Sequence, residues 1–226
     1  MSQLDSENPG ELAPLWVYVS DPPYSTPWGE ARFDSYASPG LPDAWFDGSV
    51  HKAGAIDFPS VYAAYTDLFN QRHAVPTDVT IEVGAVPVSD ATYTLQARVC
   101  VDTGGAAKWV RIYIARALDN YPVGAQYYRN CLMDVAPTAD LVLLPGQPQV
   151  VERTMTFDAT SWARQGDIRV FAWAQVPGDS GVRAVHQSAL AAWPLVPLLT
   201  PGDMNCDGSV SFKDINPFVV LLSTRD

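Results

Sequence analysis

Basic residues and long apolar runs are scarce in this sequence. Lys and Arg number 14 against 25 Asp and Glu, which gives a formal net charge of -11. A nucleic-acid backbone or an anionic membrane surface would repel such a chain at long range, so we expect no nucleic-acid partner. No apolar run approaches the ~20 residues of a membrane-spanning helix, and the first five residues lack the basic and apolar regions of a signal peptide. We therefore expect no membrane insertion.

The charged fraction is low as well. Only 17% of the residues are charged, whereas glycine and proline number 15 and 19. This composition favours short strands joined by turns over long helices. We therefore predict a mainly β protein, and 226 residues are enough for two packed units and a tail.

Residues 1–75 predict a small α/β unit. The hydrophobic periods and turn signals indicate a strand, a short helix, a strand with its return strand, and a longer helix. These elements are expected over Leu15 to Val19, Trp28 to Tyr36, Ala44 to Gly48, from Val50, and over Pro59 to Arg72. Asp57 is the expected N-cap of the longer helix.

Pro42 lies in the run Gly40-Leu41-Pro42, directly before the aromatic strand of the predicted hairpin. This Gly-x-Pro step and the order of elements over Leu12 to Val75 resemble the second half of a thioredoxin fold. The resemblance implies that residues 1–75 form a partial thioredoxin-like lobe and that Pro42 is the cis proline of that family.

Redox members of that family carry a Cys-x-x-Cys pair in the half of the fold that precedes this resemblance. The three cysteines of the chain are Cys100, Cys131 and Cys206, and none of them forms such a pair. One hypothesis is therefore that Met1 is an internal start, and that the chain is a fragment of a secreted thiol-disulfide oxidoreductase that lacks its Cys-x-x-Cys half.

Residues 76–194 predict a series of short, alternating strands. They are expected over Val79 to Val83, Tyr93 to Val101, Trp109 to Ala115, Tyr127 to Val135, Leu141 to Leu144, Val150 to Phe157, Ile168 to Ala174 and Val182 to Ala189. Strands at this spacing predict an antiparallel β-sandwich of the immunoglobulin-like or jelly-roll-like kind. With the preceding lobe, the span from Leu12 to Trp193 resembles secreted or outer-membrane bacterial proteins with a thioredoxin-like domain followed by a β-sandwich.

Cys100 and Cys131 each fall in a predicted strand of the sandwich. The resemblance implies an extracellular or cell-surface location, where disulfides persist, and we predict a disulfide between these two residues. Two free, buried thiols are the alternative.

The stretch from Asp203 to Asp214 indicates a metal ligand. Oxygen-bearing side chains stand at positions one, three, five and twelve, and Gly208 at position six permits the sharp turn of an EF-hand calcium loop. We predict a Ca2+ site with the ligands Asp203, Asn205, Asp207, the carbonyl of Ser209, and Asp214. The alternative is an Asx-rich turn that binds nothing.

A short amphipathic helix is predicted after this loop, and the Pro-rich linker of residues 195–201 precludes a helix before it. Residues 202–226 therefore resemble one dockerin repeat, the half EF-hand by which secreted bacterial proteins dock onto a cohesin. Dockerins carry two such repeats, and one is found here. The resemblance implies a cohesin-like or other protein partner, with Phe212 and Lys213 as the contact residues.

Three other groups of residues have simpler explanations. The run Gly178-Asp179-Ser180-Gly181 is similar to a serine-protease nucleophile loop, but it lacks an oriented base and is expected to be a hairpin turn. His51, His73 and His186 are too scattered for a zinc motif. Trp109 with Tyr127 and Tyr128 is the best cluster for stacking on a sugar, and core or edge packing is the simpler expectation.

Together these patterns predict a non-enzymatic secreted or cell-surface protein whose calcium-binding tail serves attachment or protein-protein interaction. The oxidoreductase fragment and a carbohydrate-binding β-sandwich are the alternative hypotheses.

Overall fold

The computed structural model describes residues 2–178 and 181–198. Its helices are α1 (Ser2–Glu7), α2 (Pro27–Tyr36), α3 (Phe58–His73), α4 (Ala159–Trp162) and the 3-10 helix η1 (Gln165–Asp167). Its strands are β1 (Asp43–Phe46), β2 (Val50–Ala53), β3 (Val79–Ser89), β4 (Thr92–Val101), β5 (Lys108–Leu118), β6 (Tyr121–Val123), β7 (Gln126–Tyr128), β8 (Cys131–Val135), β9 (Ala139–Leu143), β10 (Gln149–Thr156), β11 (Ile168–Gln175) and β12 (Val185–Ala192). None of the helices in these ranges is long and apolar enough to span a membrane.

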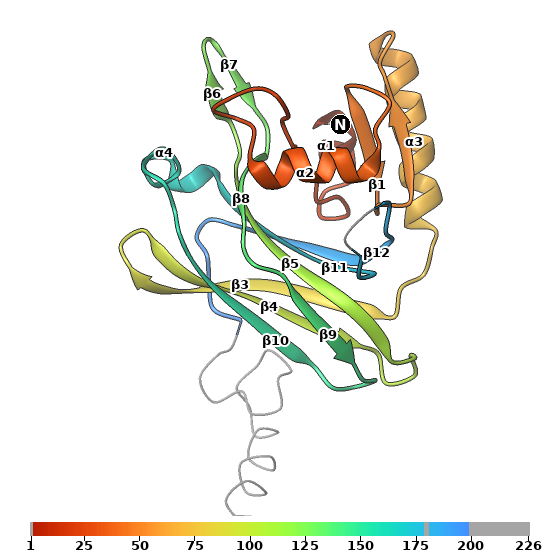
Figure 1. The fold of residues 1–226 in the computed structure, drawn as a ribbon, viewed down its shortest axis with the longest axis vertical. Coiled ribbons are helices and arrows are strands. Elements are labelled where there is room, and N and C mark those ends of the chain that lie inside the picture. The colour runs from red at the N-terminus through yellow and green to blue at the C-terminus, as the bar shows by residue number, and fades with distance from the viewer. Residues whose placement is uncertain (1, 179–180, 199–226) are drawn as a thin grey trace, which may run out of the picture.

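An antiparallel β-sandwich forms the body of the protein (Figure 1). One sheet has three strands in the order β10-β4-β3. The other has five, in the order β12-β11-β5-β8, with β9 pairing with the first half of β5. The predicted mainly β, antiparallel sandwich is therefore confirmed.

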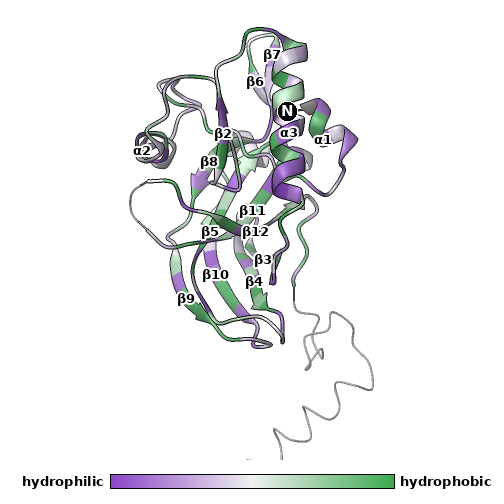
Figure 2. Cartoon of the chain, turned by 90° about the vertical axis from the view of Figure 1, so that its right-hand side faces the viewer, coloured by the Kyte–Doolittle hydropathy of each residue, from purple (hydrophilic) through white to green (hydrophobic). Residues whose placement is uncertain are grey.

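Alternating side chains of the strands fill the space between the two sheets. Leu95, Ala97 and Val99 of β4 are fully buried, and Ile112 and Ile114 of β5 meet them from the other sheet. Because neighbouring residues of a strand point to opposite faces, the period-two pattern in the sequence produces this core. Figure 2 shows that hydrophobic residues follow the strands, whereas α3 carries polar residues on its surface.

The outer face of the five-stranded sheet is also covered. Residues of β5, β8 and β11 form a second apolar cluster there, which contains Tyr113, Ala115, Ala117, Leu132, Phe171 and Trp173. Leu15, Val17 and Trp28 from the N-terminal part of the chain pack on this cluster. Strand β11 is therefore buried on both faces and appears in the sequence as a nearly continuous apolar run.

The N-terminal part also has a small core of its own, formed by Leu4, Phe46, Tyr65 and Phe69. Helix α3 lies against the β1–β2 hairpin in this core. Its N-cap is Asp57, as predicted, because the carboxylate accepts a 2.9 Å hydrogen bond from the backbone N–H of Ser60.

Two predicted strands differ from the structure. Leu15 to Val19 is not a strand, because it makes only isolated bridges, from Trp16 to Cys131 of β8 and from Tyr18 to Ser25. The predicted strand over Tyr127 to Val135 is divided into β7 and β8. Asn130 interrupts it with a φ of 41° while its backbone N–H donates to the carboxylate of Asp119. Helices α1, α4 and η1 were not expected from periodicity, because each is too short to show a period.

After β12, Trp193 and Leu195 pack in the core, and the chain then passes the β3 edge of the three-stranded sheet to its outer face. The carbonyl of Val196 accepts a 2.8 Å hydrogen bond from the backbone N–H of Ala85, and the backbone N–H of Leu198 donates to the side chain of Gln96. A side chain at Gly84 would collide with this segment, since a Cβ there would lie 2.6 Å from the Val196 carbonyl oxygen. The described part of the predicted Pro-rich linker is thus held against the sheet.

Candidate functional site

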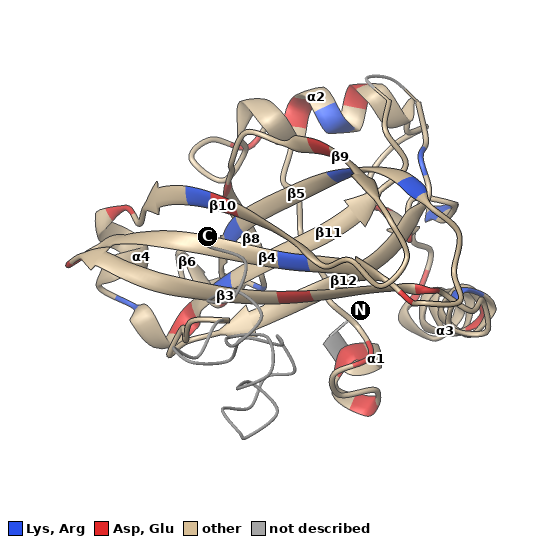
Figure 3. Cartoon of the chain, turned by 90° about the horizontal axis from the view of Figure 1, so that it is seen from below, with Lys and Arg blue, Asp and Glu red and all other residues tan. Residues whose placement is uncertain are grey.

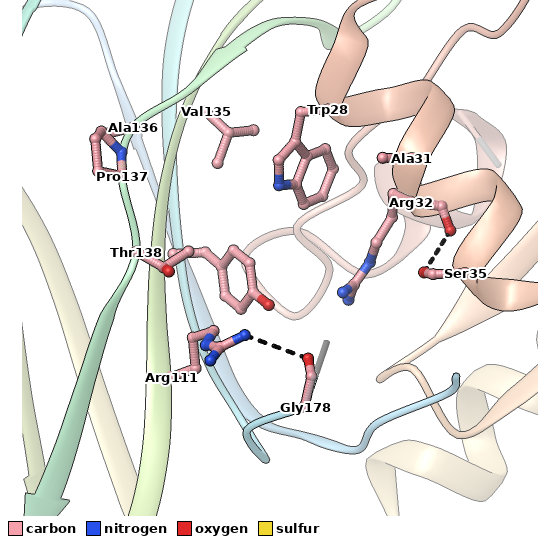
Figure 4. A pocket seen from close by; sticks show the side chains of 11 residues that line it. Trp28, Ala31, Arg32, Ser35, Arg111, Val135, Ala136, Pro137, Thr138 and Gly178 are labelled. Carbon is pink, nitrogen blue, oxygen red and sulfur yellow. Dashed lines mark hydrogen bonds between the residues drawn. The ribbon is translucent and has the colours of Figure 1, made fainter. Parts of the chain in front are cut away.

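A cleft of about 450 Å³ opens between α2 and the outer face of the five-stranded sheet (Figure 4). Helix α2 contributes Trp28, Ala31, Arg32 and Ser35, strand β5 contributes Arg111 and Tyr113, and the remaining lining comes from Val135, Ala136, Pro137, Thr138 and Gly178. This volume lies within the range of roughly 300–1,000 Å³ that is typical of small-ligand sites.

The segment that connects β8 to β9 forms one wall of the cleft. The backbone N–H of Ala136 still pairs with the carbonyl of Ile114 on β5. Pro137 follows and has no N–H to donate, so regular pairing with β5 stops and resumes at Ala139. The short irregular segment leaves room beside β5 that a continuous strand would occupy.

Arg32 of α2 points into the cleft (Figure 4). Its guanidinium lies 4.5 Å from the ring centre of Tyr36, 5.5 Å from that of Trp28 and 5.6 Å from that of Tyr113. The Nη2 atom donates hydrogen bonds to the hydroxyl of Tyr36 at 2.5 Å and to the amide oxygen of Gln175 at 2.7 Å. Rings and hydrogen bonds together fix the position of this cation.

Gln175, at the end of β11, holds Arg32 in place through a hydrogen bond. Its side chain is only 1% exposed. The amide oxygen faces Arg32, and the amide nitrogen donates a 2.6 Å hydrogen bond to the carbonyl of Arg183. Both ends of the buried amide are therefore satisfied, and its orientation is defined.

Arg111 faces Arg32 from β5 and has a carboxylate partner. Its Nε and Nη2 atoms donate to Asp140 of β9 at 2.6 and 2.8 Å, and its Nη1 donates to the carbonyl of Gly178 at 3.3 Å. The hydrogen bond from Arg111 lowers the pKa of Asp140 below its ordinary value, against a smaller opposing effect of burial. Asp140 thus compensates the charge of Arg111.

Arg32 and Arg111 differ in whether a described carboxylate lies within ion-pair distance of the guanidinium. Across residues 2–178 and 181–198, no carboxylate lies within ion-pair distance of Arg32. The described lining of the cleft also contains no carboxylate, imidazole or thiol. Among its described residues, the site therefore presents Arg32 as a cation without a carboxylate partner, between aromatic rings, a composition that suits binding of an anionic group.

Trp109 lies at the open edge of this region. It alternates with Arg111 and Tyr113 along β5, so all three side chains share the outer face, and it is 62% exposed. Tyr127 and Tyr128, predicted to form a cluster with it, follow β5 and β6 at the other end of the sheet (Figure 1). The structure does not bring the three residues together.

Tyr128 instead belongs to a separate group of tyrosines. Its ring stacks on Tyr18 at 3.9 Å, and Tyr24 meets it edge-on at 5.0 Å. Asp21 accepts a hydrogen bond from the Tyr128 hydroxyl. These contacts hold the β6–β7 hairpin against the N-terminal segment, so packing explains them.

The three histidines lie apart, as expected from their spacing. His51 contacts Asp43 through Nδ1 at 2.9 Å and stacks on Trp45 at 4.2 Å. The Asp43 side chain is 3% exposed. His73 lies near Glu11, and burial lowers the pKa of His186.

The His51–Asp43 pair has the arrangement of a base held by a carboxylate. Asp43 also accepts hydrogen bonds from Ser38 at 2.6 Å and from the indole of Trp45 at 3.0 Å. Ser38 thus donates to the aspartate and is no nucleophile for the imidazole. The network closes the β1–β2 hairpin, and among the described residues no group of three His, Cys, Asp or Glu could hold a metal ion.

The predicted cis proline and the two cysteines of the sandwich lie within the described residues. The peptide bond between Leu41 and Pro42 is cis, as expected at Pro42. Cys100 on β4 and Cys131 on β8 are free thiols, so the predicted disulfide is not formed. Cys100 alternates with the core residues Val99 and Val101 and therefore faces away from the other sheet, which carries Cys131. Burial, with a smaller effect from Asp21, raises the pKa of Cys131 to about 12.

The predicted calcium ligands Asp203, Asn205, Asp207, Ser209 and Asp214 lie outside the described residues, as do Phe212 and Lys213. Their roles remain predictions from sequence.

The cleft was not predicted from the sequence. No motif marks Arg32 or Gln175, and Arg111 is one of several arginines in strands. The only available signal was the alternation of Trp109, Arg111 and Tyr113, which places two aromatic residues and a cation on one face of a strand.

No family profile and no curated protein matches the sequence. Among solved structures, HBP35 of Porphyromonas gingivalis is similar over 75% of this chain, with 12% identity and a TM-score of 0.57. This chain covers 58% of that protein's chain. Protein AGR_C_4864 from Agrobacterium tumefaciens is 16% identical over 82% of this chain and 79% of its own, with a TM-score of 0.47. The similarity to HBP35 shows a shared fold.

Proposed function

We propose that this is a non-enzymatic secreted or cell-surface protein that is attached to a partner through a calcium-binding, dockerin-like tail. The observation that carries the proposal is the complete ligand pattern from Asp203 to Asp214, with Gly208 at the turn. Three carboxylates in so short a loop repel one another until a divalent ion neutralises them. The partner is a cohesin-like or other protein, contacted by Phe212 and Lys213.

Calorimetry tests the calcium site. Titration of Ca2+ into the metal-free protein should show one binding event, and Asp214→Ala should abolish most of it because position twelve closes the ligand shell. Lys213→Ala is the matched control, since position eleven supplies no ligand. If the wild-type protein shows no heat of binding and no change in hydrogen exchange over residues 210–222, the tail is only a turn and the attachment role is wrong.

The proposal includes a partial thioredoxin-like origin for the N-terminal lobe. The succession of the β1–β2 hairpin and α3 after Pro42 supports it. The oxidoreductase alternative places the redox pair in a half of the fold that this sequence does not contain, so insulin reduction by this chain is expected under neither hypothesis. An in-frame Cys-x-x-Cys encoded upstream of Met1 would favour that alternative.

Carbohydrate binding by the sandwich is a second candidate function. It is supported by the cleft and by Trp109, whose exposed indole lies on the same sheet face. A glycan array tests this function independently of calcium, because the cleft and the tail are separate parts of the sequence.

A further inference from the structure

We propose that the cleft between α2 and the five-stranded sheet binds a carboxylate-bearing sugar residue of a polysaccharide, with Arg32 as the residue that receives the carboxylate. This inference depends on the proposed carbohydrate-binding function and adds the chemical class of the sugar.

Arg32 has N–H groups that are available to a ligand. Both of its hydrogen bonds leave from Nη2, toward Tyr36 and Gln175. The N–H groups of Nε and Nη1 have no partner in the part of the chain that the structure describes. An anionic oxygen in the cleft would accept from these groups, and a charge-assisted hydrogen bond of this kind is stronger than a neutral one.

Arg32 is already positioned for a ligand. A flexible surface arginine loses side-chain freedom when it binds a ligand, and this cost weakens binding. Here three aromatic rings and the buried amide of Gln175 hold the guanidinium before any ligand arrives. The arrangement is that of a preorganised anion receptor in a protein whose net charge is -11. Figure 3 shows the positions of its basic residues dispersed among those of acidic residues along the ribbon.

Trp109 offers a flat surface for the remainder of the ligand. Two residues before Arg111 on the same face of β5, Trp109 is 62% exposed and lies opposite Val142, which is 60% exposed. The N-terminal part of the chain covers this sheet face near Tyr113 but leaves this end open. A flat, exposed indole matches the C–H face of a pyranose ring, and the hydroxyls of Ser35 and Thr138 in the lining suit its hydroxyl groups. A sugar acid offers a carboxylate to Arg32 and a pyranose ring to the indole of Trp109.

Calorimetric titration of the wild-type protein tests the ligand class. Three oligosaccharides of equal length are compared, with a chelator present so that the tail takes up no calcium: oligogalacturonate, its methyl ester and a neutral galactose oligomer. We expect oligogalacturonate to bind at least roughly tenfold more tightly than the methyl ester, because esterification removes the charge and keeps the sugar ring. Equal binding of all three would retain carbohydrate binding and overturn the role of the carboxylate. Binding of none would overturn both.

Variants test the residues. Arg32→Gln should lose roughly tenfold or more in affinity for oligogalacturonate, and Trp109→Ala should weaken all oligomers that bind. The matched controls are Arg164→Gln and Tyr127→Ala, because this arginine also lies over a ring, at 6.0 Å, and both residues lie away from the cleft. Wild-type affinity in Arg32→Gln would overturn the proposal. If that variant does not fold, the comparison of acid and ester with the wild-type protein decides.

A peptide ending in a free carboxylate is the competing ligand. Tight binding of such a peptide, lost when its end is amidated, without binding of oligogalacturonate would show that Arg32 receives a carboxylate from a protein. That result would overturn the assignment to sugars.

Discussion

The Nη2 atom of Arg32 donates a 2.7 Å hydrogen bond to the side-chain oxygen of Gln175, across 143 positions of the sequence. One residue is on α2 and the other ends β11, so this bond joins the N-terminal part of the chain to the sandwich. Gln175 in turn donates to the carbonyl of Arg183, before β12. A single buried amide therefore links three segments beside the cleft.

Removal of that amide should destabilise the fold. Gln175→Ala leaves the Arg183 carbonyl and one donor of Arg32 without their partner, and we expect the free energy of unfolding to fall by about 2–3 kcal/mol. Urea unfolding followed by tryptophan fluorescence measures it. Gln149→Ala is the control, because this exposed side chain donates one hydrogen bond, to Val142, and its loss should change stability by less than about 0.5 kcal/mol. Equal losses in the two variants would show that the buried amide is not a structural link.

Gly48 is predicted to be intolerant of a side chain. Its φ is 55°, and a Cβ at this position would lie 2.3 Å from the carbonyl oxygen of Arg183. Gly48→Ala should therefore cost more than about 3 kcal/mol, because a backbone atom must move in addition to the strain of the left-handed conformation. Gly54→Ala separates the two effects: its φ is 73° but it has no atom within 4 Å, so only about 1 kcal/mol is expected. Similar melting temperatures for both variants would contradict the predicted collision.

Asp119 should make stability depend on pH. Burial alone would raise the pKa of this carboxyl, but the hydrogen bonds from Arg129 and from the Asn130 N–H, with the charge of Arg169, lower it below the ordinary value. The folded protein then holds the proton more weakly than the unfolded chain. The carboxylate therefore stabilises the fold above the unfolded pKa of about 3.9, and this contribution is lost as the pH falls toward the folded pKa.

The variant Asp119→Asn tests this dependence. At pH 7 it should lose about 3 kcal/mol, because it leaves arginine charges without their partner, and its difference from the wild-type protein should narrow toward pH 3. Urea unfolding at several pH values measures both. Glu82→Gln is the control, since its pair with Arg98 lies at the surface, where ion pairs contribute little. A difference that is constant with pH would contradict the lowered pKa.

The two sandwich cysteines should differ in reactivity. In a Cys206→Ser background at pH 8, Cys100 should react with iodoacetamide at least roughly a hundredfold faster than Cys131. Cys131 is fully buried and its pKa is raised to about 12, so its thiolate is scarce, whereas Cys100 is half-buried. Peptide mass spectrometry measures the labelling, and both should react at similar rates in urea. A product that lacks two hydrogens and resists labelling would instead show a disulfide.

Local patterns were sufficient for most elements of the sandwich. The ranges of β3, β4, β10 and β11 begin at or within a residue or two of the predicted positions, because alternation depends on residues that are near one another in the chain. The N-cap at Asp57 depends on a residue three positions away, so it too was visible in the sequence.

Elements that depend on distant partners were not visible. Leu15 to Val19 has the composition of a strand but makes only isolated bridges. The strand ending at Val135 is interrupted where the carboxylate of Asp119 binds the Asn130 N–H. The disulfide expected between Cys100 and Cys131 required knowledge of the sheet face on which each thiol lies, and Cys100 lies on the outer face of its sheet. Spacing along the chain carries no such information.

The sequence by itself determined the mainly β class, the succession of strands and the calcium-loop pattern from Asp203 to Asp214, because each is encoded in residues a few positions apart. Only the tertiary structure decided the cleft. Arg32 and Gln175 become neighbours because α2 packs on the outer face of the five-stranded sheet, and Trp109 remains exposed because that packing stops short of it. These contacts depend on how a helix and a sheet fit together, which is set by the summed burial of many distant side chains.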